Sequence, residues 1–245
     1  KNIEYINLDC QKIFKTQNSL LKKFKPNYIF HLGEFSRVFP SFENKNKCFD
    51  SNIIGTLNVL KYSLKKKSKL IYSASSIHWG AKHHSLSPYA WTKAKNVELI
   101  KNFSKWFNLN FSIATFFNVY GKNQITIGDM SSVIGKFEIQ YIKKKKLTVV
   151  KPGTQHRDFT HIDDAIEGII LCAIKGKRKE YQIGSGKSYS IISVAKIFKH
   201  KIKLIKERPG DIFTGKANLA LAKKELRYFP KGNLKKYINC FLKSF

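Results

Sequence analysis

The sequence lacks the features that mark membrane, secreted and metal-binding proteins. No run of about 18 apolar residues occurs, which is the length that a transmembrane helix needs, and the first residues do not form a charged leader before a long apolar stretch. The four cysteines are scattered and form no C-x-x-C pair, which favours neither a zinc site nor a disulfide framework. We therefore expect a cytoplasmic protein that does not associate with a membrane.

Acidic residues are also scarce. The chain of 245 residues has 16 Asp and Glu against 46 Lys and Arg, which gives a formal net charge of +30. Such an excess is typical of proteins that bind nucleic acid or an anionic membrane. However, only five of the basic residues are arginine, the residue that binds phosphate in a bidentate manner, and the lysines are spread along the whole chain. We therefore do not expect nucleic acid as a partner.

The stretch SPYAWTK at residues 87–93 predicts a helix that Ser87 caps and Pro88 begins. Tyr89 then lies in the first turn, and Lys93 lies one turn later on the same face. A tyrosine ionises near pH 10 in water, but an adjacent fixed positive charge favours the phenolate, which can then act as a general base near neutral pH. The alternative is an amphipathic helix with one aromatic residue and one lysine by chance, because a motif of two residues is weakly specific.

A buried strand is predicted from Lys69 into a loop of small residues, which places Ser75 or Ser76 at its carboxyl end, where open α/β sheets bind ligands. Ser, Tyr and Lys in this order resemble the catalytic set of the short-chain dehydrogenase/reductases. Other segments resemble the extended branch of that family, the NAD-dependent sugar-nucleotide epimerases and dehydratases. The resemblance implies that Ser75, Tyr89 and Lys93 are catalytic, that NAD is the cofactor, and that a UDP-sugar or another NDP-sugar is the substrate.

Segments in the first half of the chain resemble the family's cofactor-binding motifs. KPNYIFHLG at residues 25–33 is similar to the family's KPD-hydrophobic-HLA strand, which ends beside the cofactor's diphosphate, and NIIGT at 52–56 is similar to its N-x-x-G-T helix. Asp9 resembles the acid that contacts adenine, although a simple helix N-cap explains it equally well. The resemblance implies a set of cofactor-binding residues: Asp9, His31, Asn52, Ser73, Tyr89, Lys93 and Phe116.

Segments in the second half resemble the family's substrate-binding motifs. FFNVYG at residues 116–121 is similar to an aromatic-aromatic-N-x-Y-G strand and loop, with Thr115 where arginine is usual, a change that we expect to leave a local salt bridge unmade. The loop GTQHRDFTHIDD at 153–164 is similar to G-x-Q-x-RDF-x-x-V-DD, and ERPGD at 207–211 to RPGD. The resemblance implies a set of substrate-binding residues: Ser75, Asn118, Arg157, Arg208 and Asp211.

Two histidines and an aspartate in the second of these motifs could be interpreted as metal ligands. These are His156, His161 and Asp163, and no fourth partner at zinc-like spacing accompanies them, so we expect no metal site. One of the two aspartates at 163–164 is instead expected to lie at the start of the next helix.

Alternating helical and strand patterns up to about residue 120 predict an α/β fold with a Rossmann-like, doubly wound parallel sheet. We assign residues 1–120 to an NAD-binding domain and 121–245 mainly to a smaller C-terminal α/β substrate-binding region, with about 158–199 returning to the sheet. Residues 2–8 are predicted to form a strand, followed by a helix through Leu21. No G-x-x-G-x-x-G loop occurs, so the Rossmann domain is N-terminally incomplete; either the chain is part of a longer protein or it binds NAD poorly.

The resemblance is greatest to UDP-glucose 4-epimerases, which oxidise the sugar at C4 transiently through a 4-keto intermediate. Dehydratases of the family place an Asp-Glu pair after the active-site Ser or Thr, and decarboxylases a Glu, whereas Ser75 is followed by Ser76 and Ile77. A reductase or dehydratase of the same family and a catalytically inactive sugar-nucleotide-binding protein are the alternatives. The resemblance also implies a homodimer formed through the Tyr89 helix and the helix before it.

Overall fold

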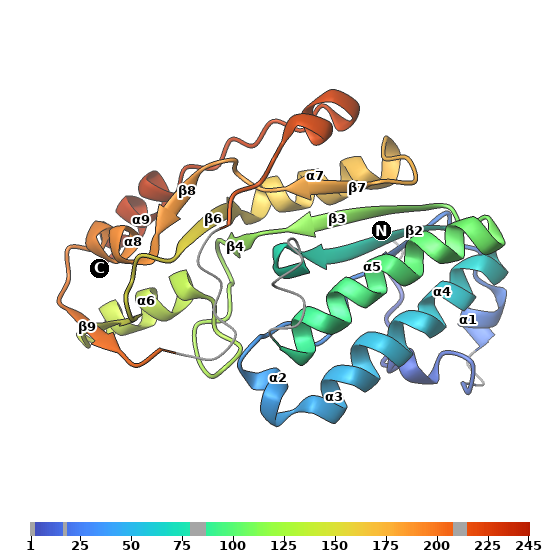
Figure 1. The fold of residues 1–245 in the computed structure, drawn as a ribbon, viewed down its shortest axis with the longest axis horizontal. Helices are drawn as coiled ribbons and strands as arrows, with labels where there is room; N and C mark the ends of the chain where they lie inside the picture. The colour runs from blue at the N-terminus through green and yellow to red at the C-terminus, as the bar shows by residue number, and fades with distance from the viewer. Residues whose placement is uncertain (1–2, 17–18, 79–86, 208–214) are drawn as a thin grey trace.

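The computed structural model describes residues 3–16, 19–78, 87–207 and 215–245. A parallel sheet with helices on both faces forms the larger part, and a smaller part of short strands and helices lies beyond the carboxyl ends of its strands (Figure 1). The strands are β1 (Tyr28–His31), β2 (Lys69–Ser75), β3 (Phe111–Phe116), β4 (Asn118–Tyr120), β5 (Leu147–Val150), β6 (His156–His161), β7 (Glu180–Ile183), β8 (Ser188–Ser190) and β9 (Ile202–Ile205). The helices are α1 (Ser19–Lys23), α2 (Pro40–Glu43), α3 (Lys45–Phe49), α4 (Gly55–Lys66), α5 (Pro88–Phe107), α6 (Val133–Ile142), α7 (Ile162–Ile174), α8 (Ile191–Ile197) and α9 (Leu234–Leu242). Short 3₁₀ helices span Cys10–Lys12 and Ser76–His78, and π-helical turns span Asp50–Ile54 and Ala222–Leu226.

The larger sheet has the strand order β1-β2-β3-β7, and all three pairings are parallel. Helices α4 and α5 cover one face and α7 covers the other, as Figure 1 shows. Because both faces are covered, β2 and β3 consist of nearly continuous buried residues rather than alternating ones. The predicted doubly wound α/β fold is confirmed.

The smaller part contains two further sheets and its own core. Strand β6 pairs with β4 in parallel and with β8 in antiparallel, and β5 pairs with β9. Of the segment 158–199, α7 and β7 pack in or on the larger sheet, whereas β6 and β8 belong to the smaller part. The expectation of a loop over 153–164 was therefore wrong for His156–His161. Strand partners on both edges, which are distant in sequence, hold this segment in an extended conformation.

The strand predicted for residues 2–8 is not formed over residues 3–8. Ile3 and Tyr5 are 84% and 89% exposed, and no strand among the described residues lies beside this segment to receive its backbone hydrogen bonds. A 3₁₀ helix follows at Cys10–Lys12 and the short helix α1 at Ser19–Lys23. The alternating pattern in this segment was thus an insufficient signal without a neighbouring strand.

Helix α5 begins as the sequence predicts. Ser87 has an extended backbone, its Oγ accepts a hydrogen bond of 3.1 Å from the backbone N–H of Ala90, and Pro88 is the first helical residue. The cap fixes where the helix starts, and it therefore fixes which face of α5 presents Tyr89 to the rest of the molecule.

Candidate active site

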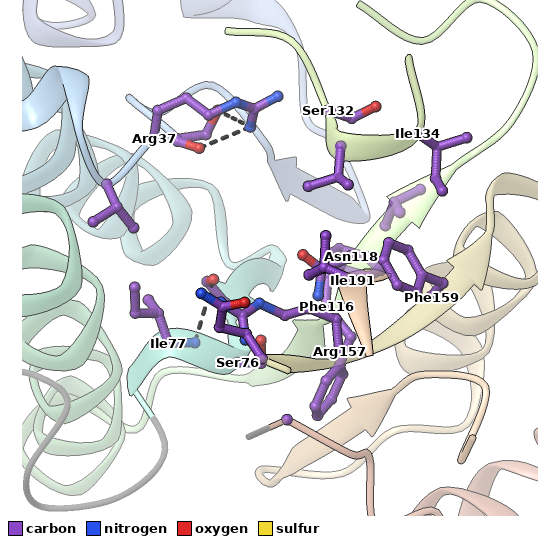
Figure 2. Close-up of a pocket in the computed structure, with 18 of the residues that line it drawn as sticks. Arg37, Ser76, Ile77, Phe116, Asn118, Ser132, Ile134, Arg157, Phe159 and Ile191 are labelled. Carbon is purple, nitrogen blue, oxygen red and sulfur yellow. Dashed lines mark hydrogen bonds between the residues drawn. The ribbon is translucent and has the colours of Figure 1, made fainter. Parts of the chain in front are cut away.

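A cavity of about 1190 Å³ lies where the carboxyl ends of β2 and β3 meet the smaller part. Five residues from the predicted site line it: Ser75 from the end of β2, Tyr89 from α5, Phe116 from the end of β3, Asn118 from β4 and Arg157 from β6. Figure 2 labels Ser76, Ile77, Asn118 and Arg157 among the residues that line this cavity. The tertiary structure thus brings together predicted site residues from five elements of the chain.

Tyr89 lies in the first turn of α5 and is 7% exposed. Its backbone N–H donates to Ser41 Oγ on α2 at 3.3 Å, and it packs in a small apolar cluster with Cys48, Ile77 and Ala90. These contacts hold the start of α5 against α2, α3 and the turn after β2, so that Tyr89 remains at the cavity wall.

Lys93 lies one turn after Tyr89 and is 4% exposed, but it does not line the cavity. Its Nζ donates to the backbone carbonyl of Ser73 at 2.6 Å and to Glu34 Oε2, with which it forms a buried ion pair. The ammonium also lies 4.9 Å from the centroid of the Tyr72 ring, a favourable cation–π distance. Sequence analysis missed Glu34, although an acid three residues after β1, in a chain poor in acids, was a signal that could have revealed it.

The Glu34 carboxylate is the centre of a buried polar cluster in which its side chain is only 1% exposed. Oε1 accepts hydrogen bonds from Thr56 Oγ1 at 2.6 Å and from Asn96 Nδ2 at 2.8 Å, and Tyr72 OH donates to the same carboxylate. Burial, assisted by the charge of Glu34, raises the pKa of Tyr72 well above its usual value. The pKa of His31, whose Nε2 is 2.8 Å from Thr56 Oγ1, is lowered chiefly by burial.

The remaining residues of the predicted cofactor set lie in two different places. Phe116 lines the cavity, whereas Asp9, His31, Asn52 and Ser73 do not. Asn52 is fully buried and both accepts from and donates to the backbone of residue 35, which fixes the loop after β1. Ser73 Oγ donates to the carbonyl of His31 at 2.9 Å, and Asp9 Oδ1 accepts from the N–H of residue 11 at 2.9 Å as a helix N-cap.

The turn that follows Ser75 is tied to the far edge of the sheet. His78 Nδ1 contacts the carbonyl oxygen of Ser75, and His78 Nε2 lies 2.6 Å from Glu180 Oε1 on β7. The His78 ring thus connects the backbone at the end of β2 to a carboxylate on β7. Although burial opposes ionisation, hydrogen bonds from His78 and Thr115 and the charge of Lys101 lower the pKa of Glu180 to about 2.

Thr115 makes no ion pair, as expected, but its side chain has a hydrogen-bond partner in Glu180. Its hydroxyl donates to Glu180 Oε1 at 2.7 Å, and the ion pairs of Glu180 come from Lys101 and His78. The local charge balance that an arginine gives elsewhere in the family is therefore met here by groups from α5 and from the turn after β2.

Of the predicted substrate residues, Asn118 and Arg157 line the cavity from β4 and β6. Asn118 Nδ2 donates to the carbonyl of Asp158 at 3.3 Å, and Arg157 Nη1 donates to its neighbouring carbonyl at 2.9 Å. Asp158 is fully buried and accepts from the backbone N–H groups of Gly186 at 2.8 Å and Ala217 at 3.1 Å, so it fixes the segment beside the cavity that follows residue 214. Arg208 and Asp211 lie outside the described residues.

Arg37 is a second residue that sequence analysis missed, and unlike Glu34 it lines the cavity. Its Nε donates to the carbonyl of Met130 at 3.0 Å and its Nη1 to that of Ser36 at 2.8 Å, so it connects the loop after β1 to the loop before α6. The charged side chains that line the cavity in the described part of the chain are mostly cationic, being Arg37, Lys136, Arg157 and Lys216 against Asp129. This excess of positive charge suits an anionic ligand.

Neither a metal cluster nor a membrane-spanning helix is found in the described ranges. No group of three or more His, Cys, Asp or Glu side chains there could hold a metal ion, and none of the helices there combines the length and the apolar character that crossing a membrane requires.

Comparison with known proteins identifies the family. Residues 3–184 match the model of the NAD dependent epimerase/dehydratase family. The chain belongs to this family. One relative is the UDP-glucuronate 4-epimerase of Thermodesulfobacterium geofontis. Its sequence is 29% identical to this one, over 94% of this chain and 76% of the relative's own length.

Solved structures of similar fold agree with this assignment. A UDP-glucose 4-epimerase from Thermotoga maritima, crystallised with UDP-glucose, has a TM-score of 0.89 at 22% identity, covering 96% of this chain and 82% of its own; at that identity the likeness shows the fold alone. The UDP-glucuronic acid 4-epimerase of Bacillus cereus, in complex with UDP-glucuronic acid and NAD, has a TM-score of 0.81 at 25% identity, covering 97% and 79%.

Proposed function

We propose that this chain forms the active site of an NDP-sugar epimerase, most similar to the UDP-glucose 4-epimerase type. The observation that supports this best is the shared cavity, which is lined by Ser75, Tyr89, Asn118 and Arg157 together. Pockets for drug-sized ligands measure roughly 300–1,000 Å³, so a cavity of about 1190 Å³ has room for a molecule as large as a nucleotide sugar.

In this proposal Tyr89 takes the proton of the sugar 4-hydroxyl, and Ser75 donates a hydrogen bond to the same oxygen. Tyr89 is suited to this role because its side chain lies at the cavity wall while its helix is fixed by Ser41 and by the Ser87 cap. Ser75 is suited because His78 and Glu180 hold its backbone in place.

The described residues fit one half of an NAD molecule. Gly33, at the carboxyl end of β1, leaves open space, since a Cβ added there would meet nothing closer than Cys10 Sγ at 4.0 Å. Tyr89 lines the cavity, where it would contact the nicotinamide and its ribose, and Ser73 and Lys93, which do not line it, are proposed as further contacts from the motif alone. The glycine-rich loop that holds the diphosphate does not occur in these 245 residues. When bound, NAD would accept hydride from the sugar carbon and return it.

The part of the cavity that Arg157 lines would hold the nucleotide diphosphate. Arg157 is placed for a charge-assisted contact with a phosphate, and the other cationic side chains of the cavity would attract the same group. We propose Arg208 and Asp211 as further contacts from the motif alone. Asn118, on the wall between Phe116 and Arg157, would contact the sugar.

Three alternatives to an epimerase were considered from the sequence: a dehydratase, a reductase and a protein without catalytic activity. A dehydratase needs an acid and a base near C5, and Ser75 is followed on the cavity wall by Ser76 and Ile77, which supply neither. A reductase would consume NADH or NADPH steadily, and an inactive protein would bind the nucleotide sugar without converting it.

We also propose a homodimer. Phe49 and Trp91 are 38% and 39% exposed, and their rings lie 5.7 Å apart on the surface formed by α3 and α5, next to exposed Ile54. An exposed apolar patch on these elements is the kind of surface that a second copy would cover.

The test is a comparison of the protein encoded by the natural gene with its Tyr89→Phe variant. With UDP-glucose, and in parallel UDP-glucuronate, as substrate and NAD present, inversion at C4 is followed by proton NMR of the sugar. We expect turnover with no net change in absorbance at 340 nm. Tyr89→Phe should lower kcat by at least about 100-fold, the smallest rate effect that is typical of a general base. Substrate binding, measured by calorimetry, should change little.

The control is Tyr62→Phe, a tyrosine of α4 whose hydroxyl bonds only to a backbone carbonyl far from the cavity. Near-normal kcat in Tyr89→Phe would contradict the assignment of the base. Steady loss of absorbance at 340 nm with added NADH would identify a reductase instead.

A further inference from the structure

The guanidinium of Arg37 lines the cavity as a half-buried positive charge whose partners are all neutral. Its Nε and Nη2 donate to the carbonyl of Met130, and its Nη1 donates to the carbonyl of Ser36 at 2.8 Å. Nη2 carries two protons, so one of them has no acceptor among the described residues. No acidic side chain of those residues forms an ion pair with Arg37, and this includes Asp129, which lines the same cavity.

This arrangement leaves the charge of Arg37 incompletely stabilised. Burial lowers the pKa of Arg37, which shows that its surroundings favour the charged form less than water does. An arginine nevertheless stays protonated in a protein, and a charge that is removed from water is usually paired with an opposite charge. The two backbone carbonyls offer dipoles but no negative charge. An anionic group of a ligand in the cavity would supply the missing counter-charge.

The backbone that carries Arg37 is fixed beside Tyr89. Val38, the next residue, packs against the apolar cluster that contains Tyr89 and Ile77. Four residues after Arg37, the Oγ of Ser41 accepts a hydrogen bond of 3.3 Å from the backbone N–H of Tyr89. Arg37 therefore lines the part of the cavity in which, on the proposed function, the sugar meets the base.

The cations that would hold the diphosphate come from the smaller part of the molecule. Arg157 lies on β6, and Lys216 lies in a segment close to it, since a Cβ added at Gly215 would be 3.8 Å from the carbonyl oxygen of His156. Figure 2 shows Arg37 and Arg157 well apart. In a nucleotide sugar the diphosphate is attached at C1, and the ring separates it from C4 and the group on C5. Although every cation of the cavity attracts a diphosphate, one in contact with Arg157 leaves Arg37 available to a second anionic group.

We propose that Arg37 is a specificity-determining residue that binds a carboxylate on the sugar, so that the preferred substrate is a nucleotide sugar with an anionic substituent, such as a hexuronate. The proposal rests on the proposed function and narrows its substrate. A charge-assisted hydrogen bond from a guanidinium to a carboxylate is roughly twice as strong as a bond between neutral groups. A hydroxymethyl group in the same place would leave Arg37 without a counter-charge, so the uncharged sugar binds less tightly.

The test compares the dissociation constants of UDP-glucuronate and UDP-glucose by calorimetry, with the protein encoded by the natural gene and with NAD present. The wild type should bind UDP-glucuronate at least about 10-fold more tightly, which corresponds to about 1.4 kcal/mol at 25 °C. Arg37→Gln keeps an N–H group for the carbonyl of Met130 but removes the charge, so its two dissociation constants should agree within about 2-fold. UDP, which has no sugar, should bind the wild type and Arg37→Gln equally well.

The matched control is Arg178→Gln, the same change at an exposed arginine that does not line the cavity. It should keep the full preference for UDP-glucuronate. If Arg37→Gln does not fold, the wild type can be tested with the amide of UDP-glucuronate, which has the size of the carboxylate without its charge. The amide should bind at least about 10-fold less tightly than UDP-glucuronate.

Three results would overturn the proposal. These are equal affinities of the wild type for the two sugars, a preference that Arg37→Gln retains, and weaker binding of UDP by Arg37→Gln, which would place the diphosphate on Arg37. Inversion of UDP-glucose at C4 without any preference for the charged sugar would count against this inference and support the proposed function. Selective binding of UDP-glucuronate without inversion at C4 would support the role of Arg37 and count against the proposed function.

Discussion

The link between His78 and Glu180 predicts a stability that depends on pH. Glu180 lies on β7 with an 8% exposed side chain, and its partners lower its pKa from 4.5 to about 2. In Glu180→Gln the carboxylate is lost while size and shape are kept. The variant therefore isolates the contribution of the charge that ties the Ser75 turn to the far edge of the sheet.

The magnitude follows from the two pKa values. A difference of about 2.5 units at 1.36 kcal/mol per unit gives about 3 kcal/mol of stabilisation where the carboxylate is ionised in both states. Because the pKa of Glu180 is lower in the folded state, this stabilisation is present above the unfolded value near 4.5 and is lost as the pH falls towards 2. The same relation gives about 2 kcal/mol at pH 3.5.

The assay is urea unfolding followed by circular dichroism at pH 5.5 and pH 3.5, at one ionic strength. The free energy of unfolding of Glu180→Gln should be about 3 kcal/mol below that of the wild type at pH 5.5, and the gap should narrow by about 1 kcal/mol at pH 3.5. Glu98→Gln serves as the control for a change of charge on the surface. A gap of constant size at the two pH values would refute the reasoning.

Two further predictions concern the smaller part and the surface. Asp158→Ala leaves the N–H groups of Gly186 and Ala217 without their acceptor. It should therefore lower the free energy of unfolding, measured with urea, by about 3 kcal/mol or more. An unchanged urea midpoint would contradict the role of Asp158 in holding the cavity wall. Sedimentation equilibrium should give the mass of a dimer for the wild type and of a monomer for Trp91→Glu with an unchanged circular dichroism spectrum; a monomeric wild type would contradict the dimer.

Local sequence signals predicted those parts of the fold that depend on residues close together in the chain. Ser87 and Pro88 determine where α5 begins, because a cap and a fixed φ act within one turn. Arg227 takes a positive φ of 60° at the end of the last π-helical turn, a left-handed conformation that costs a residue with a Cβ about 1–2 kcal/mol. The strand expected at residues 2–8 failed because pairing, unlike capping, needs a neighbour.

For the site, the sequence by itself determined which chemical groups are available and on which face of a helix or at which end of a strand each one lies. The order of Ser75, Tyr89 and Lys93 and the family to which the chain belongs followed from it. Only the tertiary structure decided what surrounds those groups. Glu34 meets Lys93 across 59 residues and His78 meets Glu180 across 102, and the charge of a buried group depends on such neighbours because little water is present to screen it.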